Sequence, residues 1–169
     1  MHRLHEAGCF LIPNPWDVGS ARWLQGLGFK ALATTSSGFA WSRAHADNGI
    51  TRDMALAHLA DMVAATEVPI NADFESGFAI MPADVAGNVA AAVTTGIAGL
   101  SIEDSTGDEL NPLFDFSLSV DRMRAARQAI DESGSRVLLT GRSEGFIVGR
   151  PDLAETIRRL TAYSEAGAD

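Results

Sequence analysis

Short apolar runs alternate with stretches of helical periodicity along the whole chain, and this alternation most constrains the fold. Each run is followed by a segment in which apolar residues recur every three or four positions, the spacing of one helix face. No hairpin signal separates consecutive runs, so the strands are predicted to be parallel and joined by right-handed crossovers. The five predicted strands cover residues 9–13, 31–35, 68–73, 99–102 and 136–140.

Capping residues and glycines mark the ends of the predicted helices. Thr51 is placed to cap a helix with Asp53 in its first turn, and Pro82 is a favoured first-turn residue. Glycines follow several of the periodic segments, as is typical of helix ends. We expect helices over 17–27, from 51 onward, over 82–95, across 120–134 and over 151–167, with loops at 39–50 and 108–116.

Two architectures fit five βα units: an open doubly wound sheet and a (β/α)8 barrel. Polar residues follow nearly every predicted strand, whereas an open sheet concentrates its site at one switch point. This pattern favours the barrel. A complete barrel needs roughly 200 residues or more, and this chain has 169. We therefore expect a single partial α/β-barrel catalytic domain over 1–169, covering about the first five units and leaving its last strand unpaired.

Composition excludes several classes of protein. The net charge of −9 argues against a nucleic-acid partner, and a hydrophobic fraction of 46% is sufficient for a buried core. No apolar stretch approaches the roughly 20 residues that span a bilayer, and the first residues lack a signal-peptide core. Cys9 is the only cysteine, and we expect it to be a small buried hydrophobe. We interpret the chain as cytoplasmic, with no membrane partner.

Carboxylates gather after two of the predicted strands. Asp73 and Glu75 are two residues apart, so on a strand both point to the same side, and Glu103 and Asp104 end the next strand. Carboxylates this close repel one another unless a cation or solvent relieves them. The alternative to a shared cation site is that Asp73 and Glu75 are two exposed acids at a solvated strand end. Oxygen ligands without histidine or cysteine favour Mg²⁺, with Mn²⁺ as an alternative.

Two further strand ends carry polar residues. Small hydroxyl residues and a glycine occupy 34–38, where backbone N–H groups can hold a carboxylate or phosphate oxygen, although an ordinary turn explains them equally well. Arg142 ends the fifth strand and needs a partner there: Glu144, Glu103 or an anionic substrate.

The histidines and tryptophans carry less information. His2, His5 and His58 are expected at the surface, whereas His45 lies in a long loop beside Asp47. The tryptophans are expected to be packing residues, with Trp41 close enough to residues 36–38 to wall a pocket; they occupy positions 16, 23 and 41.

Taken together, these segments resemble the isocitrate lyase/phosphoenolpyruvate mutase superfamily, and the resemblance runs through nearly the whole chain. The residues that carry it are Pro-Asn-Pro-Trp-Asp at 13–17, Thr-Ser-Ser-Gly at 35–38, Ala-Asp-Asn-Gly at 46–49, Asp-Phe-Glu-Ser-Gly at 73–77, Ile-Glu-Asp at 102–104 and Gly-Arg-Ser-Glu at 141–144. The resemblance implies a Mg²⁺-dependent enzyme on an α/β barrel that makes or breaks C–C or P–C bonds next to a 2-oxo acid, through a pyruvate enolate held on the metal.

The resemblance also implies a role for each site residue. Asp73 would be the principal metal ligand, and Glu75, Glu103 and Asp47 would hold waters of the ion. The carboxylate end of the substrate would lie on Arg142 and on the backbone of Ser36, Ser37 and Gly38. Asp47, Glu103 and Arg142 would be the catalytic residues, and the full-length protein is expected to be a homo-oligomer.

Residues 105–114 depart from both main branches of the superfamily. The lyase branch has a loop with a catalytic cysteine there, and this chain has neither cysteine nor lysine in it. The phosphonomutase branch has an Asn-Ser pair, whereas here Asn111 precedes Pro112. The hypothesis is a lyase or decarboxylase of an oxaloacetate-like 2-oxo acid. The alternatives are a P–C bond enzyme, such as a phosphonopyruvate hydrolase or phosphoenolpyruvate mutase, and a non-catalytic carboxylate-binding fragment of the same fold.

Overall fold

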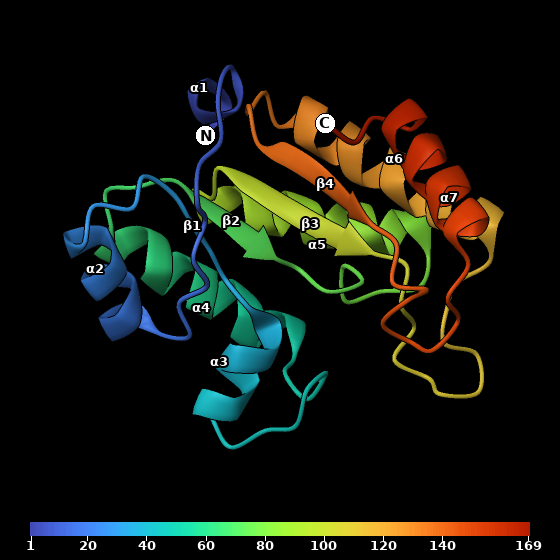
Figure 1. The fold of residues 1–169 in the computed structure, drawn as a ribbon, viewed down its shortest axis with the longest axis horizontal. Helices are drawn as coiled ribbons and strands as arrows, with labels where there is room; N and C mark the ends of the chain where they lie inside the picture. Colours follow the sequence, from blue (N-terminus) through green and yellow to red (C-terminus); the bar gives the residue numbers. More distant parts are fainter.

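Four parallel strands form the centre of the computed structural model, which describes residues 1–169. They are β1 (Leu32–Ala33), β2 (Ile70–Asp73), β3 (Gly99–Glu103) and β4 (Leu138–Arg142), and they lie in chain order (Figure 1). Each strand pairs with the next in parallel, with Asp73 opposite Ser101 and Glu103 opposite Arg142. All four carboxyl ends therefore lie at the same edge of the sheet, as predicted.

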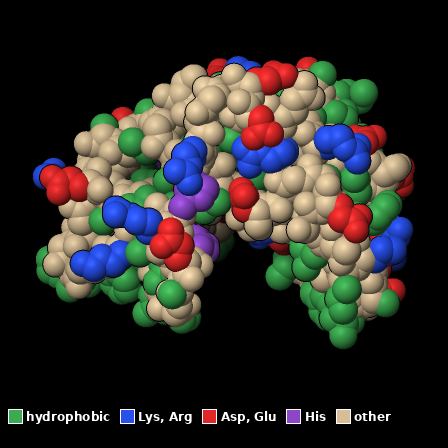
Figure 2. Space-filling model, turned by 90° about the horizontal axis from the view of Figure 1, so that it is seen from above, with side chains coloured by type: hydrophobic (Ala, Val, Ile, Leu, Met, Phe, Trp, Pro, Cys, Tyr) green, Lys and Arg blue, Asp and Glu red, His purple; other side chains and the backbone are tan.

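Seven helices accompany the sheet, and none has the length and apolar character that crossing a bilayer requires. Figure 1 shows α5 and α6 behind the sheet, whereas the N-terminal segment crosses the opposite face near β1. Seen from above, the molecule is hollowed between two flanks (Figure 2). The helices are α1 (His2–His5), α2 (Val18–Gly26), α3 (Ser36–Ser42), α4 (Arg52–Ala65), α5 (Pro82–Thr94), α6 (Phe116–Glu132) and α7 (Leu153–Glu165).

The apolar core lies between the sheet and the covering helices. Leu100 on β3 is fully buried, as are Met62, Val89 and Ile130 on α4, α5 and α6. Burial of such side chains contributes about 1.5–3 kcal/mol each relative to exposure. The core thus fixes the helices against one face of the sheet and leaves the strand ends for polar residues.

Two elements differ from the sequence-based prediction. Residues 9–13 form no strand: the chain runs beside β1, where the Ala33 N–H donates to Pro13 O at 3.0 Å and the Asn14 side chain donates to Ala33 O at 3.1 Å. Pro13 and Pro15 have no N–H to give to a ladder, which explains why pairing stops. The expected loop over 39–50 begins instead inside α3, whose first N–H groups Thr35 caps by accepting from Gly38 N. The Thr51 cap of α4 is confirmed, since its hydroxyl accepts from Met54 N.

Several burial expectations were wrong. Cys9 is exposed, because the segment that carries it forms no strand and is not covered. His58 is buried in α4, where its ring stacks on Phe39 with centroids 3.9 Å apart. Trp16 and Trp41 are about half exposed and contact each other edge to face, and Trp23 is 72% exposed. These tryptophans are therefore surface residues.

Candidate functional site

Arg142 lies at the centre of a cluster of carboxylates at the carboxyl edge of the sheet. Its Nη1 is 3.2 Å from Asp73 Oδ1 and 3.4 Å from Glu103 Oε2. Its Nη2 is 2.8 Å from Glu144 Oε1, and its Nε donates to the same oxygen at 3.0 Å. Glu144, Glu103 or an anionic substrate was expected to pair with Arg142, and the structure shows both glutamates and also Asp73 in contact with it. One guanidinium thus joins the ends of β2, β3 and β4.

Asp73 is held by the N-terminus of α3. Its Oδ2 accepts hydrogen bonds from the backbone N–H and the hydroxyl of Ser36, both at 2.9 Å. The Asp73 N–H donates in turn to Thr34 Oγ1 at 2.9 Å. These two hydrogen bonds fix the direction of the Asp73 carboxylate. Its other oxygen faces Arg142.

Glu75 brings a second carboxylate to the same place in an unusual backbone conformation. Its φ is +47°, in the left-handed region that non-glycine residues rarely adopt. Its carbonyl accepts from the Glu103 N–H at 3.0 Å, which ties the two residues together. Its Oε1 is buried and has no hydrogen-bond partner in the chain. A buried, unpaired carboxylate oxygen is costly unless it meets a cation or water.

The electrostatics of the cluster favour an added cation. Burial, followed by the charges of Asp73 and Glu103, raises the pKa of Glu75 to about 7. Burial also raises the pKa of Glu103 to about 7, although Arg142 favours its charged form. Asp73, Glu103 and Glu144 share a single guanidinium, and the Glu75 carboxylate adds to their charge, so the cluster carries excess negative charge when all four are ionised.

The donor set fits a hydrated Mg²⁺ better than a closed metal cage. No three His, Cys, Asp or Glu side chains of the chain are grouped tightly enough to hold an ion by themselves. Mg²⁺ keeps several waters and takes only one or two carboxylates, so it does not need such a cage. Asp73 and Glu75 offer oxygens of this kind, and the unpaired Glu75 Oε1 is the structural sign that a partner is missing.

Asp47 and the segment 36–38 lie around this cluster, and they differ in their exposure and in their hydrogen bonds. Asp47 is exposed, and its charge contributes to the raised pKa of Glu75. Ser36 and Gly38 already give their N–H groups to Asp73 and Thr35, whereas the Ser37 N–H has no partner in the chain. A Cβ on Gly38 would lie 2.5 Å from Trp16 Cδ1, so this position requires glycine.

Asp104 has a structural environment unlike that of its neighbour Glu103. It is 2% exposed, and its Oδ1 accepts from the Glu144 N–H at 2.8 Å. Its Oδ2 accepts from Arg159 Nη1 at 3.1 Å and from the Tyr163 hydroxyl at 2.7 Å. Burial and this bond raise the pKa of Tyr163. Asp104 therefore anchors the segment after β4 to α7.

This second network was not predicted from the sequence. Arg159 and Tyr163 are four residues apart on α7 and so share one helix face, on which both are buried. An arginine and a tyrosine on the face that packs against a sheet signal a buried acidic partner.

Membership of a family follows from the sequence over its full length. The profile of the family described as phosphoenolpyruvate phosphomutase matches residues 1–169. The chain belongs to this phosphomutase family. The predicted superfamily is thereby confirmed.

Individual relatives agree with the family assignment. A Mycobacterium tuberculosis protein is 34% identical over 170 residues, which cover 99% of this chain and 62% of the relative. A crystal structure from Burkholderia cenocepacia J2315 is 48% identical with a TM-score of 0.95, over 99% of this chain and 60% of that one. Oxaloacetate acetylhydrolase, solved with its product oxalate, is 26% identical with a TM-score of 0.90, over 99% of this chain and 59% of that one.

The same relatives show the fold class of the chain and how much of their length it spans. The phosphomutase-family structures confirm the predicted TIM-barrel-type α/β fold class. The chain spans about 60% of the length of the relatives it matches.

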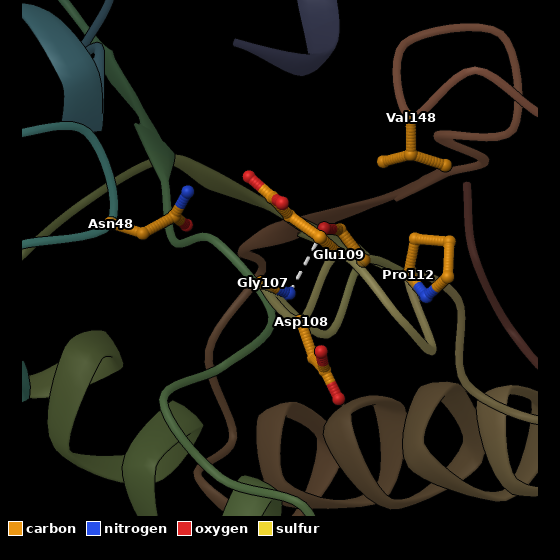
Figure 3. A pocket seen from close by; sticks show the side chains of 7 residues that line it. Asn48, Gly107, Asp108, Glu109, Pro112 and Val148 are labelled. Atoms are coloured by element: carbon orange, nitrogen blue, oxygen red, sulfur yellow. Dashed lines mark hydrogen bonds between the residues drawn. The ribbon is translucent and has the colours of Figure 1, made fainter.

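In this member of the family, three loops enclose a hollow at the same edge of the sheet. It measures about 330 Å³ and is lined by side chains from the loops after α3, β3 and β4 (Figure 3). Figure 3 shows Asn48 on one side, Asp108 and Glu109 on the loop after β3, and Val148 on the other side. The loop after β3 is stiffened by an isolated bridge between Ser105 and Leu113. This loop is the one that departs from both branches of the superfamily.

Proposed function

We propose that this chain carries the active site of a Mg²⁺-dependent lyase or decarboxylase that cleaves a C–C bond of a small 2-oxo dicarboxylic acid of the oxaloacetate type. The observation that carries the proposal is the cluster in which Arg142 contacts Asp73, Glu103 and Glu144 while Glu75 keeps an unpaired buried oxygen. The cluster combines one cation for an anionic substrate with a carboxylate set for a divalent ion.

Arg142 is suited to orient the substrate. A guanidinium binds a carboxylate through two parallel hydrogen bonds, and this geometry fixes the plane of the bound group. Arg142 is itself held in place by Glu144 through both Nη2 and Nε. The segment 36–38 is proposed to hold the same end of the substrate, with the Ser37 N–H as the group still unbound.

The acidic residues are proposed to place the ion. Asp73 would be its main ligand, with Glu75, Glu103 and Asp47 holding its waters. An ion held there would supply positive charge to the 2-oxo oxygen, where negative charge develops as the C–C bond breaks and its electron pair moves toward that oxygen. Asp73 is already fixed for this role by Ser36.

The name of the family keeps a P–C bond enzyme as the second candidate. Both reactions act next to a 2-oxo acid, so the same cluster serves either. The substrates distinguish them, because phosphonopyruvate offers a P–C bond and oxaloacetate a C–C bond at the same position. Asn111, whose side chain donates to Asp108 at 3.3 Å, lies in the loop where the two candidates differ.

The test compares the two substrates on the whole protein. Purified protein with Mg²⁺ is mixed with oxaloacetate or with phosphonopyruvate, and the loss of substrate and the release of phosphate are followed against a protein-free control. Turnover of oxaloacetate that EDTA abolishes supports the lyase. Phosphate release from phosphonopyruvate alone supports the P–C candidate, and absence of both reactions contradicts a catalytic role.

A further inference from the structure

Five consecutive backbone carbonyls follow Glu75 in the loop between β2 and α5, and two side chains bind all of them. Arg122 on α6 donates through Nη2 to the first carbonyl and through Nη1 to the last two, at 2.5 and 2.9 Å. Asn88 on α5 donates through Nδ2 to the middle two, at 2.9 and 3.4 Å. The five carbonyls belong to Ser76, Gly77, Phe78, Ala79 and Ile80.

Arg122 has no carboxylate partner, which is unusual for a buried arginine. It is 1% exposed, and its guanidinium lies 3.9 Å from the centroid of the Phe114 ring. Burying a charge is costly unless hydrogen bonds compensate for the lost water. The carbonyl oxygens of the loop and the face of Phe114 provide this compensation. The hydrogen bonds of the Arg122 guanidinium therefore all go to carbonyl oxygens of this loop.

Asn88 links the same loop to a second region of the site. Its Oδ1 accepts from Arg52 Nη1 at 3.1 Å, and Arg52 is the first residue of α4. The segment just before α4 contains Asp47. One asparagine thus joins the loop after β2 to the helix that follows the Asp47 loop.

The loop needs such support because its backbone is strained. Glu75 and Phe78 have φ values of +47° and +54°, which cost energy in non-glycine residues. Such conformations persist only where the surroundings hold them. Glu75 lies two residues after the end of β2. Its left-handed backbone conformation therefore influences where its carboxylate lies relative to the strand ends.

We propose that Arg122 and Asn88 are positioning residues for the metal site, because they fix the backbone of residues 74–81 and thereby direct the Glu75 carboxylate toward Asp73 and Glu103. The metal part of this inference rests on the proposed function. The placement of the loop does not, and it can be measured without any ligand. A purely structural role, in which both residues only join α5 to α6, is the rival explanation.

The decisive experiment replaces Arg122 and measures the loop directly. Arg122→Met removes the donors and keeps much of the volume, and Arg122→Lys keeps the charge without the fork. Arg124→Met is the matched control, because Arg124 lies two residues further along the same helix, is 60% exposed and pairs with Asp121. Hydrogen exchange of the amides in 74–81 is followed by mass spectrometry, and Mn²⁺ affinity by electron paramagnetic resonance.

We expect exchange in 74–81 to accelerate at least tenfold in Arg122→Met while the sheet stays protected. The dissociation constant of Mn²⁺ should rise about 10- to 100-fold, the range seen when groups that orient metal ligands are removed. Arg122→Lys should recover part of both effects, and Arg124→Met should stay within about twofold of the unmodified protein.

Three outcomes overturn or separate the claims. Unchanged exchange in 74–81 in folded Arg122→Met overturns the inference, as does faster exchange spread evenly over the whole chain. If Arg122→Met does not fold, hydrogen exchange in 74–81 is measured in Arg122→Lys and Asn88→Leu instead, and unchanged exchange in both overturns the inference. If the unmodified protein does not bind Mn²⁺, the proposed function fails, and loop exchange still decides whether Arg122 and Asn88 place the loop.

Discussion

Arg142 and Asp73 are 69 residues apart in the chain, yet Arg142 Nη1 lies 3.2 Å from Asp73 Oδ1. They belong to β4 and β2, which do not pair with each other, so the contact passes across the carboxyl end of β3. The parallel topology makes this contact, because it brings all the strand ends to one edge of the sheet. The same topology places Glu103 between them.

Asp73→Asn should reduce turnover by about 100-fold or more while the protein remains folded. The amide has nearly the same shape and can still accept from Ser36, but it has lost the charge that binds a cation. Steady-state rates with oxaloacetate and Mg²⁺, together with circular dichroism, check this prediction. Asp84→Asn, an exposed acid at the start of α5, is the control. Full turnover in folded Asp73→Asn would contradict the metal hypothesis.

Mg²⁺ should raise the stability of the unmodified chain. A ligand present at 100 times its dissociation constant stabilises the folded state by about 2.7 kcal/mol, which corresponds to roughly 5–10 °C for a chain of this size. The melting temperature is measured with MgCl₂ and with KCl at equal ionic strength. Asp73→Asn should lose the difference. An equal shift in both proteins would show that the ion acts elsewhere.

The parallel fold and the carboxylates of the site could be predicted from the sequence because both depend on local patterns. Strand ends follow from the apolar runs, and a polar residue after a run marks the active edge. Two of the three Arg142 partners, Glu103 and Glu144, were also among those expected, since an arginine at a buried strand end needs an anionic partner, whereas the contact with Asp73 was not expected. The strand expected over 9–13 did not form, and Pro13 within it and Pro15 just after it have no N–H to donate to a neighbouring strand.

Other features depend on tertiary contacts that no local pattern contains. Asp104 and Glu103 are adjacent acids in the sequence, and only the packing of α7 decides that Asp104 is buried against Arg159 and Tyr163. Arg122 could have been noticed, because it lies on the buried face of α6 among apolar residues. Its partners are backbone carbonyls, which leave no sequence signal.

Asp104→Asn should destabilise the protein by about 1.5–3 kcal/mol, because the buried guanidinium of Arg159 loses one of its two carboxylate partners and keeps only Glu155. Tyr163→Phe removes one hydrogen bond from the same carboxylate and should cost about 1–3 kcal/mol. Urea unfolding measures both. Asp121→Asn breaks an exposed pair with Arg124 and should cost less than about 1 kcal/mol. Equal effects for Asp104 and Asp121 would show that the buried network is not a stabilising anchor.

The 169-residue chain should self-associate through α7. Leu153, Ile157 and Leu160 recur at helical spacing on one face of it and are 65, 56 and 41% exposed. Exposed apolar stripes of this kind favour association. Sedimentation velocity should show concentration-dependent association that Ile157→Lys weakens. Glu165→Lys, at an exposed position of the same helix, is the control. A monomer at all concentrations would contradict this prediction.

The contribution of His58 to stability should decrease below neutral pH. Burial lowers the pKa of His58 to about 4, against the opposing charges of Asp61 and Asp17, and Arg43 lowers it further. The folded state therefore resists the proton that the unfolded chain takes up near pH 6.5. The stabilisation present above pH 6.5 is lost as pH falls toward 4, by about 2 kcal/mol between pH 7 and 5.

His58→Phe removes this titration while keeping an aromatic ring against Phe39. The quantity to measure is the difference in free energy of unfolding between the unmodified protein and His58→Phe at pH 7 and at pH 5, because the raised pKa values of Glu75 and Glu103 act in the opposite direction and cancel in that difference. His45→Phe, at an exposed position, should leave the pH dependence unchanged. A difference for His58→Phe that stays constant between the two pH values would show that burial of His58 does not make folding acid-sensitive.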